Sequence, residues 1–292
     1  MPGANPWLDR RVIAYAHQGG AFEAPSSTLF AMRSALAAGA TAVELDVHAT
    51  ADGELVVCHD ATVDRTTQGH GAIAAMTLAE VQALDNAYWF VPGTDVTHRL
   101  DAAAYPYRGR GPDDHEFRIP TLREVLEELP DVVLNLDIKQ TAPAVAPYEE
   151  SLARLLAEYE RGDDVIVASF LDLATDRFAA LAPDVAVSAG TLGTAMFWRA
   201  VHAGEPRPAL RAAAFQVPEH HEGSLVVDEL FVEAAHEAGM AVHVWTVDDD
   251  VSMHRLVDRG VDGIITDVPT VLAGVLEERG LRWEGLGRRD AA

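Results

Sequence analysis

The stretch ELDVHATADGELVVCHD, residues 44–60, sets the architecture of the chain. Glu44, Asp46 and His48 alternate with apolar residues, as expected for a β-strand that points every second side chain to one face. Asp52-Gly53 then supplies the residue types that a type I′ turn requires, because both of its central positions have positive φ. A turn this short cannot reach a parallel neighbour, so we expect residues 55–59 to return as an antiparallel strand.

Outside this hairpin, short β-branched runs alternate with longer segments of helical period. Helices are predicted at 28–38, 122–129, 147–160, 173–181, 194–201, 230–237 and 251–258, and capping boxes at Thr77/Glu80 and Thr121/Glu124. Strands are predicted at 12–16, 42–47, 132–138, 165–169, 185–189, 213–217, 241–246 and 263–266. Eight such strands in 292 residues predict an α/β fold, a TIM (β/α)8 barrel. An open doubly wound sheet is disfavoured, because no G-x-G-x-x-G follows the first strand.

Residues 60–120 interrupt the alternation of strands and helices. This segment is rich in glycine, aromatic and charged residues, and long connections of this kind are usually lids or small inserts. We therefore expect residues 1–292 to form one barrel domain with a small insertion after strand 2, at about 60–120.

The composition limits the classes of partner. Lys and Arg number 22 against 46 Asp and Glu, a net charge of −24, which disfavours binding to nucleic acids and to anionic membranes. No run approaches the ~20 apolar residues of a membrane span, so stable membrane insertion is not expected. Cys58 is the only cysteine and the amino terminus lacks an apolar core of signal-peptide length, so a cytoplasmic location is expected.

Polar residues gather at the predicted carboxyl ends of several strands, which is the working face of such a barrel. Glu44 and Asp46 lie late in one strand, and Asp137 and Lys139 close the next strand of the barrel. Three carboxylates together would repel one another, and at least one would be protonated unless a cation is bound. Oxygen ligands suit one divalent cation, Mg²⁺ or Ca²⁺. The alternative is an ion-pair cluster of Glu44 or Asp46 with Lys139.

Two histidines are candidates for proton transfer, since an unperturbed imidazole titrates near neutrality. His17 follows the first strand, and His59 ends the hairpin that folds back toward it. His220 and His221 lie in a polar loop and are expected to be solvated.

Five motifs resemble the glycerophosphodiester phosphodiesterase family: HDATVDRTTQGHG (59–71), TLAEVQALD (77–85), IPTLREVL (119–126), NLDIK (135–139) and VWTVDDDVSMHRLVDRGVDGIITDVP (244–269). The resemblance covers nearly the whole chain, from His17 to Pro269. It implies a barrel with an insert, a divalent metal, and hydrolysis of small-molecule glycerophosphodiesters to glycerol phosphate and an alcohol. It also implies catalytic roles for His17 and His59, metal ligation by Glu44, Asp46 and Asp137, and substrate contacts by Lys139 and Trp245.

The chain departs from the family pattern at the presumed phosphate site. The usual HRG opening reads HQG, so Gln18 stands where a phosphate-binding Arg is expected, and the usual PENT reads PSST. Glutamine donates hydrogen bonds to phosphate without charge, and charge-assisted bonds are roughly twice as strong. We hypothesise that the insert supplies the missing charge, through Arg99, Arg108, Arg110 or Arg118.

The residues leave several alternatives open. The nucleophile is either water or a neighbouring hydroxyl of the substrate, and the acid and base roles of His17 and His59 are unassigned. A lysophospholipase D-like activity would require an apolar trough, for which Trp89, Phe90 and Tyr105 are candidates. A phosphodiester binder without activity is a third possibility, and the oligomeric state is open.

Overall fold

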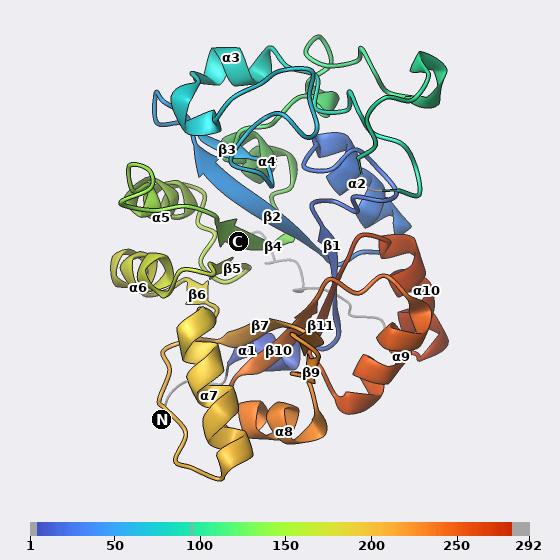
Figure 1. Ribbon diagram of the computed structural model, residues 1–292. Coiled ribbons are helices and arrows are strands. Elements are labelled where there is room, and N and C mark those ends of the chain that lie inside the picture. Colours follow the sequence, from blue (N-terminus) through green and yellow to red (C-terminus); the bar gives the residue numbers. More distant parts are fainter. Residues whose placement is uncertain (1–4, 95, 282–292) are drawn as a thin grey trace, which may run out of the picture.

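The computed structural model describes residues 5–94 and 96–281, and eight parallel strands of this part form a barrel (Figure 1). Their order around the barrel is β6-β5-β4-β2-β1-β11-β10-β7. The remaining gap is closed by a parallel bridge between Ser188 and Ala214, beside a hydrogen bond from Ala213 N to Val187 O of 2.8 Å. The TIM-barrel prediction is confirmed. The strands are β1 (Ile13–His17), β2 (Ala42–Ala49), β4 (Val133–Ile138), β5 (Val165–Ala168), β6 (Ala186–Val187), β7 (Ala214–Pro218), β10 (Ala241–Trp245) and β11 (Gly263–Thr266).

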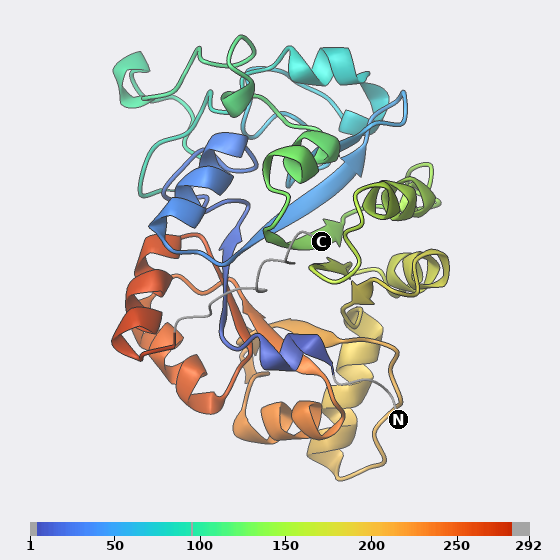
Figure 2. The same ribbon diagram turned by 180° about the vertical axis from the view of Figure 1, so that it is seen from behind.

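Helices surround the strands, as Figures 1 and 2 show from opposite sides. They are α2 (Leu29–Ala38), α4 (Leu122–Glu128), α5 (Glu149–Glu158), α6 (Asp172–Leu181), α7 (Thr191–Ala203), α8 (Glu229–Glu237), α9 (Asp250–Arg259) and α10 (Pro269–Glu278). The predicted helices are all present with shifted ends, and both predicted capping boxes form. Helix α10 was not predicted, although proline at its first position is a start signal.

The amino-terminal end of the barrel is covered by α1 (Pro6–Asp9), which Figure 2 shows across the strands. Trp7 is 1% exposed and packs in the barrel interior with Ile13 and Tyr15. Asn5 Nδ2 donates to Ala213 O at 2.7 Å, and Arg10 Nη2 donates to Asp163 O at 2.6 Å. These contacts anchor α1 to the loops that enter the strands.

The predicted hairpin is present, but its turn differs from the prediction. β3 (Leu55–Val57) pairs antiparallel with β2. Gly53 has a φ of 85° and donates from its N to Thr50 O at 3.0 Å, whereas Asp52 does not have positive φ. A type I′ turn needs positive φ at both positions, so that prediction is wrong. The loop is one residue longer, with glycine alone in the left-handed region.

The segment 60–120 folds against the outside of the barrel, above β2 and beside α2 in Figure 1. It contains η1 (Ile73–Ala75), α3 (Leu78–Gln82), η2 (Ala102–Ala104) and η3 (His115–Phe117). A small core of its own includes Val63, Ile73 and Val81, which pack with Val56 and Cys58 from the hairpin. A second addition, the ribbon of β8 (His220–His221) and β9 (Ser224–Leu225), follows β7. Within the described ranges, no helix is long and apolar enough to cross a membrane.

Candidate active site

Adjacent strands bring the predicted carboxylates together. In the β2–β4 register Asp46 lies opposite Asp137, and in the β1–β2 register His17 lies opposite Glu44. Glu44 and Asp46 are two residues apart, so both point to the barrel side of β2. Their exposed fractions are 6% and 0%, and that of Asp137 is 5%. Strand pairing therefore holds three acidic side chains in a buried space at the carboxyl ends of the strands.

Lys139 enters this space and forms two ion pairs, one with Asp46, which the alternative interpretation expected, and one with Asp137, which it did not. Its Nζ lies 2.7 Å from Asp46 Oδ1 and 2.8 Å from Asp137 Oδ2. Burial opposes protonation of this ammonium, but the charges of Asp46 and Asp137 outweigh it and raise the pKa of Lys139. One ammonium faces three carboxylates. Burial and the neighbouring charge of Asp46 raise the pKa of Glu44, and burial raises the pKa of Asp137.

Two carboxylate oxygens remain unsatisfied. Asp46 Oδ2 and Asp137 Oδ1 are buried without a hydrogen-bond partner among the described residues. Such groups cost free energy unless a partner is supplied. As they stand, no three His, Cys, Asp or Glu side chains in residues 5–94 and 96–281 are arranged to hold a metal ion together. The donor chemistry, two unpartnered oxygens beside the buried carboxyl group of Glu44, nevertheless fits a hard divalent cation.

His17 lies beside the carboxylates and is held from behind by another acidic residue. Its Nδ1 lies 2.7 Å from Asp267 Oδ1, and its Nε2 lies 3.8 Å from Glu44 Oε2. Burial lowers the pKa of His17, but the hydrogen bond to Asp267 and the charges of Glu44, Asp267 and Asp46 together raise it to about 9. Asp267 follows β11, which is the neighbour of β1 on the other side from β2.

His59 faces His17 from the end of the hairpin. Their ring centroids are 6.1 Å apart, with an interplanar angle of 87°. His59 Nδ1 lies 2.6 Å from Asp60 Oδ1, so this imidazole also has a carboxylate partner. A His Nδ1 bound to a carboxylate leaves Nε2 for proton exchange with a ligand. Both predicted histidines are thus present at one site with the same type of support.

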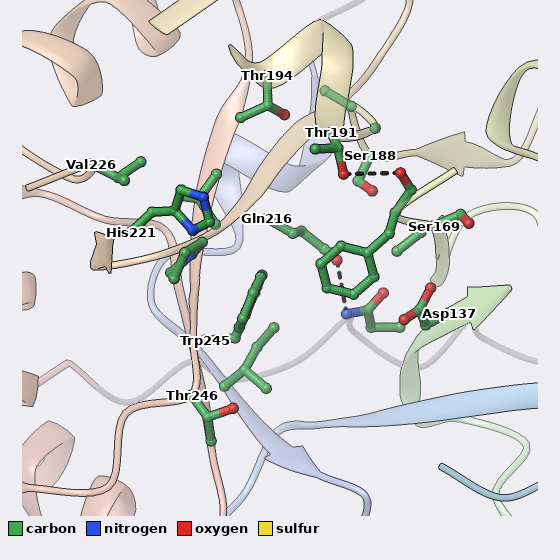
Figure 3. Close-up of a pocket in the computed structure, with 18 of the residues that line it drawn as sticks. Asp137, Ser169, Ser188, Thr191, Thr194, Gln216, His221, Val226, Trp245 and Thr246 are labelled. Atoms are coloured by element: carbon green, nitrogen blue, oxygen red, sulfur yellow. Dashed lines mark hydrogen bonds between the residues drawn. The ribbon is translucent and has the colours of Figure 1, made fainter. Parts of the chain in front are cut away.

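A cavity of about 640 Å³ connects this site with the opposite side of the barrel (Figure 3). His17, His59, Glu44, Asp137 and Lys139 line one side, here called the carboxylate wall. The apolar lining, here called the aromatic wall, consists of Phe170, Trp198, Val226 and Trp245, and Phe170 borders the carboxylate wall, since Lys139 Nζ lies 5.7 Å from its ring centroid. Asn135 Nδ2 donates to Gln216 Oε1 at 3.1 Å across the floor between them. Hydroxyl groups of Ser169, Ser188, Thr191, Thr194 and Ser224 are also present in the lining.

Of the remaining predicted residues, Trp245 lies where the resemblance implied, whereas Gln18 does not line the cavity. Trp245 lines the cavity and its ring lies 5.5 Å from that of Phe170. Gln18 is 4% exposed, and its Nε2 lies 3.1 Å from His17 Nε2, but Gln18 is not among the described residues that line the cavity. His221 is exposed, as expected, and also lines the cavity from β8, which sequence periodicity could not reveal because the ribbon strands have only two residues each.

The four arginines proposed to supply charge are engaged elsewhere or lie away from the cavity. Arg108 packs on Tyr105, with its Cζ 3.6 Å from the ring centroid. Arg110 pairs with Asp114 at 3.0 Å, and Arg118 pairs with Glu124. Neither these three nor Arg99 is among the described residues that line the cavity, so the hypothesis about them is wrong. The trough candidates Trp89, Phe90 and Tyr105 are likewise absent from the lining.

Sequence reasoning did not predict that Asp60 and Asp267 support the two histidines. Asp60 directly follows His59, and Asp267 ends the motif ITD after the last strand. An acidic residue next to a candidate histidine, and another at the end of a neighbouring strand, were the available signals. Only the strand order shows that Asp267 reaches His17 across 250 positions.

Comparisons with known proteins agree with this geometry. The model of the glycerophosphoryl diester phosphodiesterase family matches residues 17–271. A glycerophosphodiester phosphodiesterase of Caldanaerobacter subterraneus subsp. tengcongensis is 32% identical over 272 residues, which are 92% of this chain and 100% of the relative.

Solved structures give the same result for the fold. A glycerophosphodiester phosphodiesterase from Agrobacterium tumefaciens has a TM-score of 0.68 at 25% identity, covering 91% of this chain and 99% of the other. An Oleispira antarctica phosphodiesterase in complex with the product sn-glycerol-3-phosphate has a TM-score of 0.68 at 23% identity, covering 93% and 99%. The match of the family model over nearly the whole chain, together with the close sequence relative, shows that the chain belongs to the glycerophosphoryl diester phosphodiesterase family.

Proposed function

We propose that the protein hydrolyses glycerophosphodiesters to glycerol phosphate and an alcohol. The observation that carries the proposal is the pair of imidazoles, 6.1 Å apart, at a cavity that also contains buried carboxylates in excess over one lysine. The family consists of phosphoric diester hydrolases, and the relative from Caldanaerobacter bears the name of this activity. The product in the Oleispira structure supports glycerol phosphate as one half of the substrate.

One divalent cation, Mg²⁺ or Ca²⁺, completes the proposed site. Glu44, Asp46 and Asp137 would hold it, which supplies partners for Asp46 Oδ2 and Asp137 Oδ1. When bound, such an ion stabilises negative charge on the phosphoryl oxygens in the transition state. Lys139 pairs with Asp46 and Asp137 and lines the cavity, so we expect its ammonium to contact a phosphate bound there. We assign Lys139 and Trp245 to substrate binding, and Gln18 to the support of that site.

His17 and His59 carry out the proton transfers in this proposal. One takes a proton from the nucleophile, and the other gives a proton to the departing alcohol. Asp267 and Asp60 keep each ring in place, with Nδ1 engaged. The nucleophile is water or the neighbouring hydroxyl of the glycerol moiety. Turnover in heavy-oxygen water followed by phosphorus NMR separates the two, because a cyclic phosphate appears only by the second route.

The test of function uses the purified chain and bis(p-nitrophenyl) phosphate, then glycerophosphoethanolamine. Treatment with EDTA should abolish release of nitrophenol, and either Mg²⁺ or Ca²⁺ should restore it. Activity that survives exhaustive chelation would contradict the metal proposal, and no turnover of either diester with any added dication would contradict the hydrolase proposal. In that case the chain would be the phosphodiester binder without activity.

The aromatic wall favours a second candidate, a lysophospholipase D-like activity on lysolipid diesters. Phe170 is 55% exposed although it is a large apolar residue beside the cavity, and Trp198, Val226 and Trp245 extend the same surface. Apolar surface of this kind favours an apolar substituent on the substrate. Comparison of kcat/KM for lysophosphatidylethanolamine and glycerophosphoethanolamine discriminates between the two candidates.

Two broader assignments belong to the proposal. We propose that residues 1–292 work as one domain, because the insert begins with Asp60, the partner of His59. We also propose a cytoplasmic location, because Cys58 is a buried free thiol. Fractionation of cells that produce the tagged protein checks the second point.

A further inference from the structure

A row of polar contacts behind the cavity joins the two histidines. Gln18 Nε2 lies 3.1 Å from His17 Nε2, and Arg65 Nη2 donates to Gln18 Oε1 at 3.3 Å. Arg65 Nε also donates to Asp60 Oδ2 at 3.0 Å, and Asp60 Oδ1 lies 2.6 Å from His59 Nδ1. Arg65 therefore occupies the centre of the row, with one contact leading to each histidine.

The guanidinium group suits this central place. It is planar and presents several N–H donors in fixed directions, so two of its nitrogens serve two acceptors without a change of shape. The side chain of Arg65 is 26% exposed, and it does not belong to the described lining of the cavity. Arg65 also affects the charge state of Asp60. The hydrogen bond to His59 and, after it, the charge of Arg65 lower the pKa of the Asp60 carboxyl group to about 2. Asp60 is thus held as an anion that fixes the His59 ring.

On the other branch, Arg65 sets the direction of an amide. A glutamine side chain has an acceptor end and a donor end, and an arginine only donates. Since Arg65 takes Oε1 of Gln18, the donor end faces His17 Nε2, which accepts from it in the neutral form of His17 that keeps its proton on Nδ1, toward Asp267. The backbone adds to the orientation, because Gln18 has a φ of 52° and its N donates to Glu44 O at 3.0 Å. An arginine at position 18 would offer no acceptor for Arg65, so the glutamine makes this link possible.

We propose that Arg65 is a positioning residue that aligns both histidines at once, through Gln18 toward His17 and through Asp60 toward His59. The inference rests on the proposed phosphodiesterase function for its kinetic test. It assigns to the insert a role in the reaction that involves no contact with substrate. The missing charge at position 18 is thus accompanied by a nearby cation of the insert that supports the catalytic groups.

The kinetic test compares Arg65→Ala and Arg65→Lys with the matched control Arg110→Ala, an exposed arginine of the same insert paired with Asp114. Misplaced catalytic groups cost about 10²-fold. Arg65→Ala should therefore lower kcat by about that factor with KM unchanged, whereas Arg110→Ala should leave both constants unchanged. The kcat of Arg65→Lys should lie between those of wild type and Arg65→Ala, because an ammonium keeps the positive charge but lacks the planar arrangement of N–H donors. This variant replaces Arg65→Ala in the test if the alanine variant does not fold. Guanidinium ion, well below denaturing concentrations, should partly restore kcat of Arg65→Ala.

Two results would overturn the proposal. A raised KM with unchanged kcat in Arg65→Ala would mean that the guanidinium binds the substrate directly, and a kcat of Arg65→Ala equal to that of Arg110→Ala would mean that the group does not position the histidines. Nitrogen NMR of the His59 ring gives a readout without substrate. The Nδ1–H signal should be lost to exchange in Arg65→Ala and retained in Arg110→Ala. This arm tests the positioning role even if the wild type hydrolyses no diester, which would count against the proposed function alone.

Discussion

The two sides of the cavity differ in how well their polar groups are satisfied. On the carboxylate wall, Asp46 Oδ2 and Asp137 Oδ1 are buried without hydrogen-bond partners among the described residues, and the histidines are supported by further acids. On the aromatic wall, Phe170 and Trp245 pack edge to face at 5.5 Å, and Thr191 Oγ1 donates to Phe170 O at 2.9 Å. The unpartnered carboxylate oxygens raise the free energy of the carboxylate wall, and a bound cation can lower it. The rings of the aromatic wall can be buried by an apolar part of a ligand. In the proposed function, the reactive groups and the apolar surface therefore lie on different elements: β1, β2, β4 and the hairpin carry the former, and β10, α7 and the segments after β5 and β9 carry the latter.

The largest effect is expected on the carboxylate wall. His59→Ala and His17→Ala should each lower kcat by about 10²–10⁴-fold, because each removes a general acid or base. The loss should be similar for every alcohol moiety, which steady-state kinetics on two diesters checks. The control is His220→Ala, an exposed histidine of the ribbon. Full activity of both alanine variants would contradict the assignment.

Removal of the carboxylate of Asp267, which holds His17, is expected to lower kcat less than removal of the His17 ring. Asp267→Asn removes the charge next to Nδ1 and should lower kcat by about 10–10²-fold, as for other groups that orient a functional histidine. Asp64→Asn is the matched control, since Asp64 pairs with His70 on the surface of the insert at 3.1 Å. Equal effects of the two substitutions on kcat would show that Asp267 has no special role.

On the aromatic wall the effect should depend on the substrate. Trp245→Ala removes a ring that lines the cavity and should change the discrimination between two alcohol moieties by roughly 1–3 kcal/mol in kcat/KM. The rate with a diester of a small alcohol should fall least. Trp89→Ala, in which the lost ring packs with His98 inside the insert, should leave the discrimination unchanged. An equal decrease of kcat/KM for all substrates in Trp245→Ala would mean that this residue contributes to catalysis and not to selection of the alcohol.

The smallest effect on activity concerns the ribbon that follows β7. Glu219 accepts from Arg255 Nε at 2.9 Å and pairs with Arg259 at 2.7 Å, and its bonds to Arg255 lower the pKa of its carboxyl group. Glu219→Gln should reduce the free energy of unfolding by about 1.5–3 kcal/mol near neutral pH, with kcat nearly unchanged.

The pH dependence of this stability follows from the sign of the shift. A lowered folded-state pKa contributes stability above the usual carboxyl range, and the contribution is lost as the pH falls through the folded-state value. Urea unfolding of wild type and Glu219→Gln should therefore converge at acidic pH. Glu237→Gln, an exposed partner of Arg207, should differ little from wild type at any pH. A constant gap between wild type and Glu219→Gln would contradict the ion-pair explanation.

The regular part of this fold could be predicted because strands and helices differ in period. The barrel strands from 12–16 to 263–266 came from β-branched runs, and the parity of Glu44 and Asp46 placed both on one face. The site residues on strand ends were predictable for the same reason, since carboxyl ends of parallel strands meet. The alternative interpretation predicted the ion pair of Lys139 with Asp46, but not the pair with Asp137.

The irregular part could not be predicted from periodicity. His221 reaches the cavity from strands of two residues, and Arg65 meets Gln18 across 47 positions through a segment without regular structure. The prediction that Arg108 or Arg118 supplies charge to the site is wrong for a physical reason. Arg108 packs on the ring of Tyr105, and Arg118 pairs with Glu124, so both groups are held within the insert and the helix beside it. Contacts of this kind depend on the path of a loop, and local sequence carries little information about that path.

Helix α1 determines from which end of the barrel a ligand can enter the cavity. Trp7 closes the amino-terminal end from inside, and Asn5 and Arg10 tie the helix to the entering loops. Any ligand of the cavity must then enter and leave at the other end of the barrel. In the proposed hydrolysis, the product that lies deeper should leave only after the outer one, and should act as a competitive inhibitor when added back.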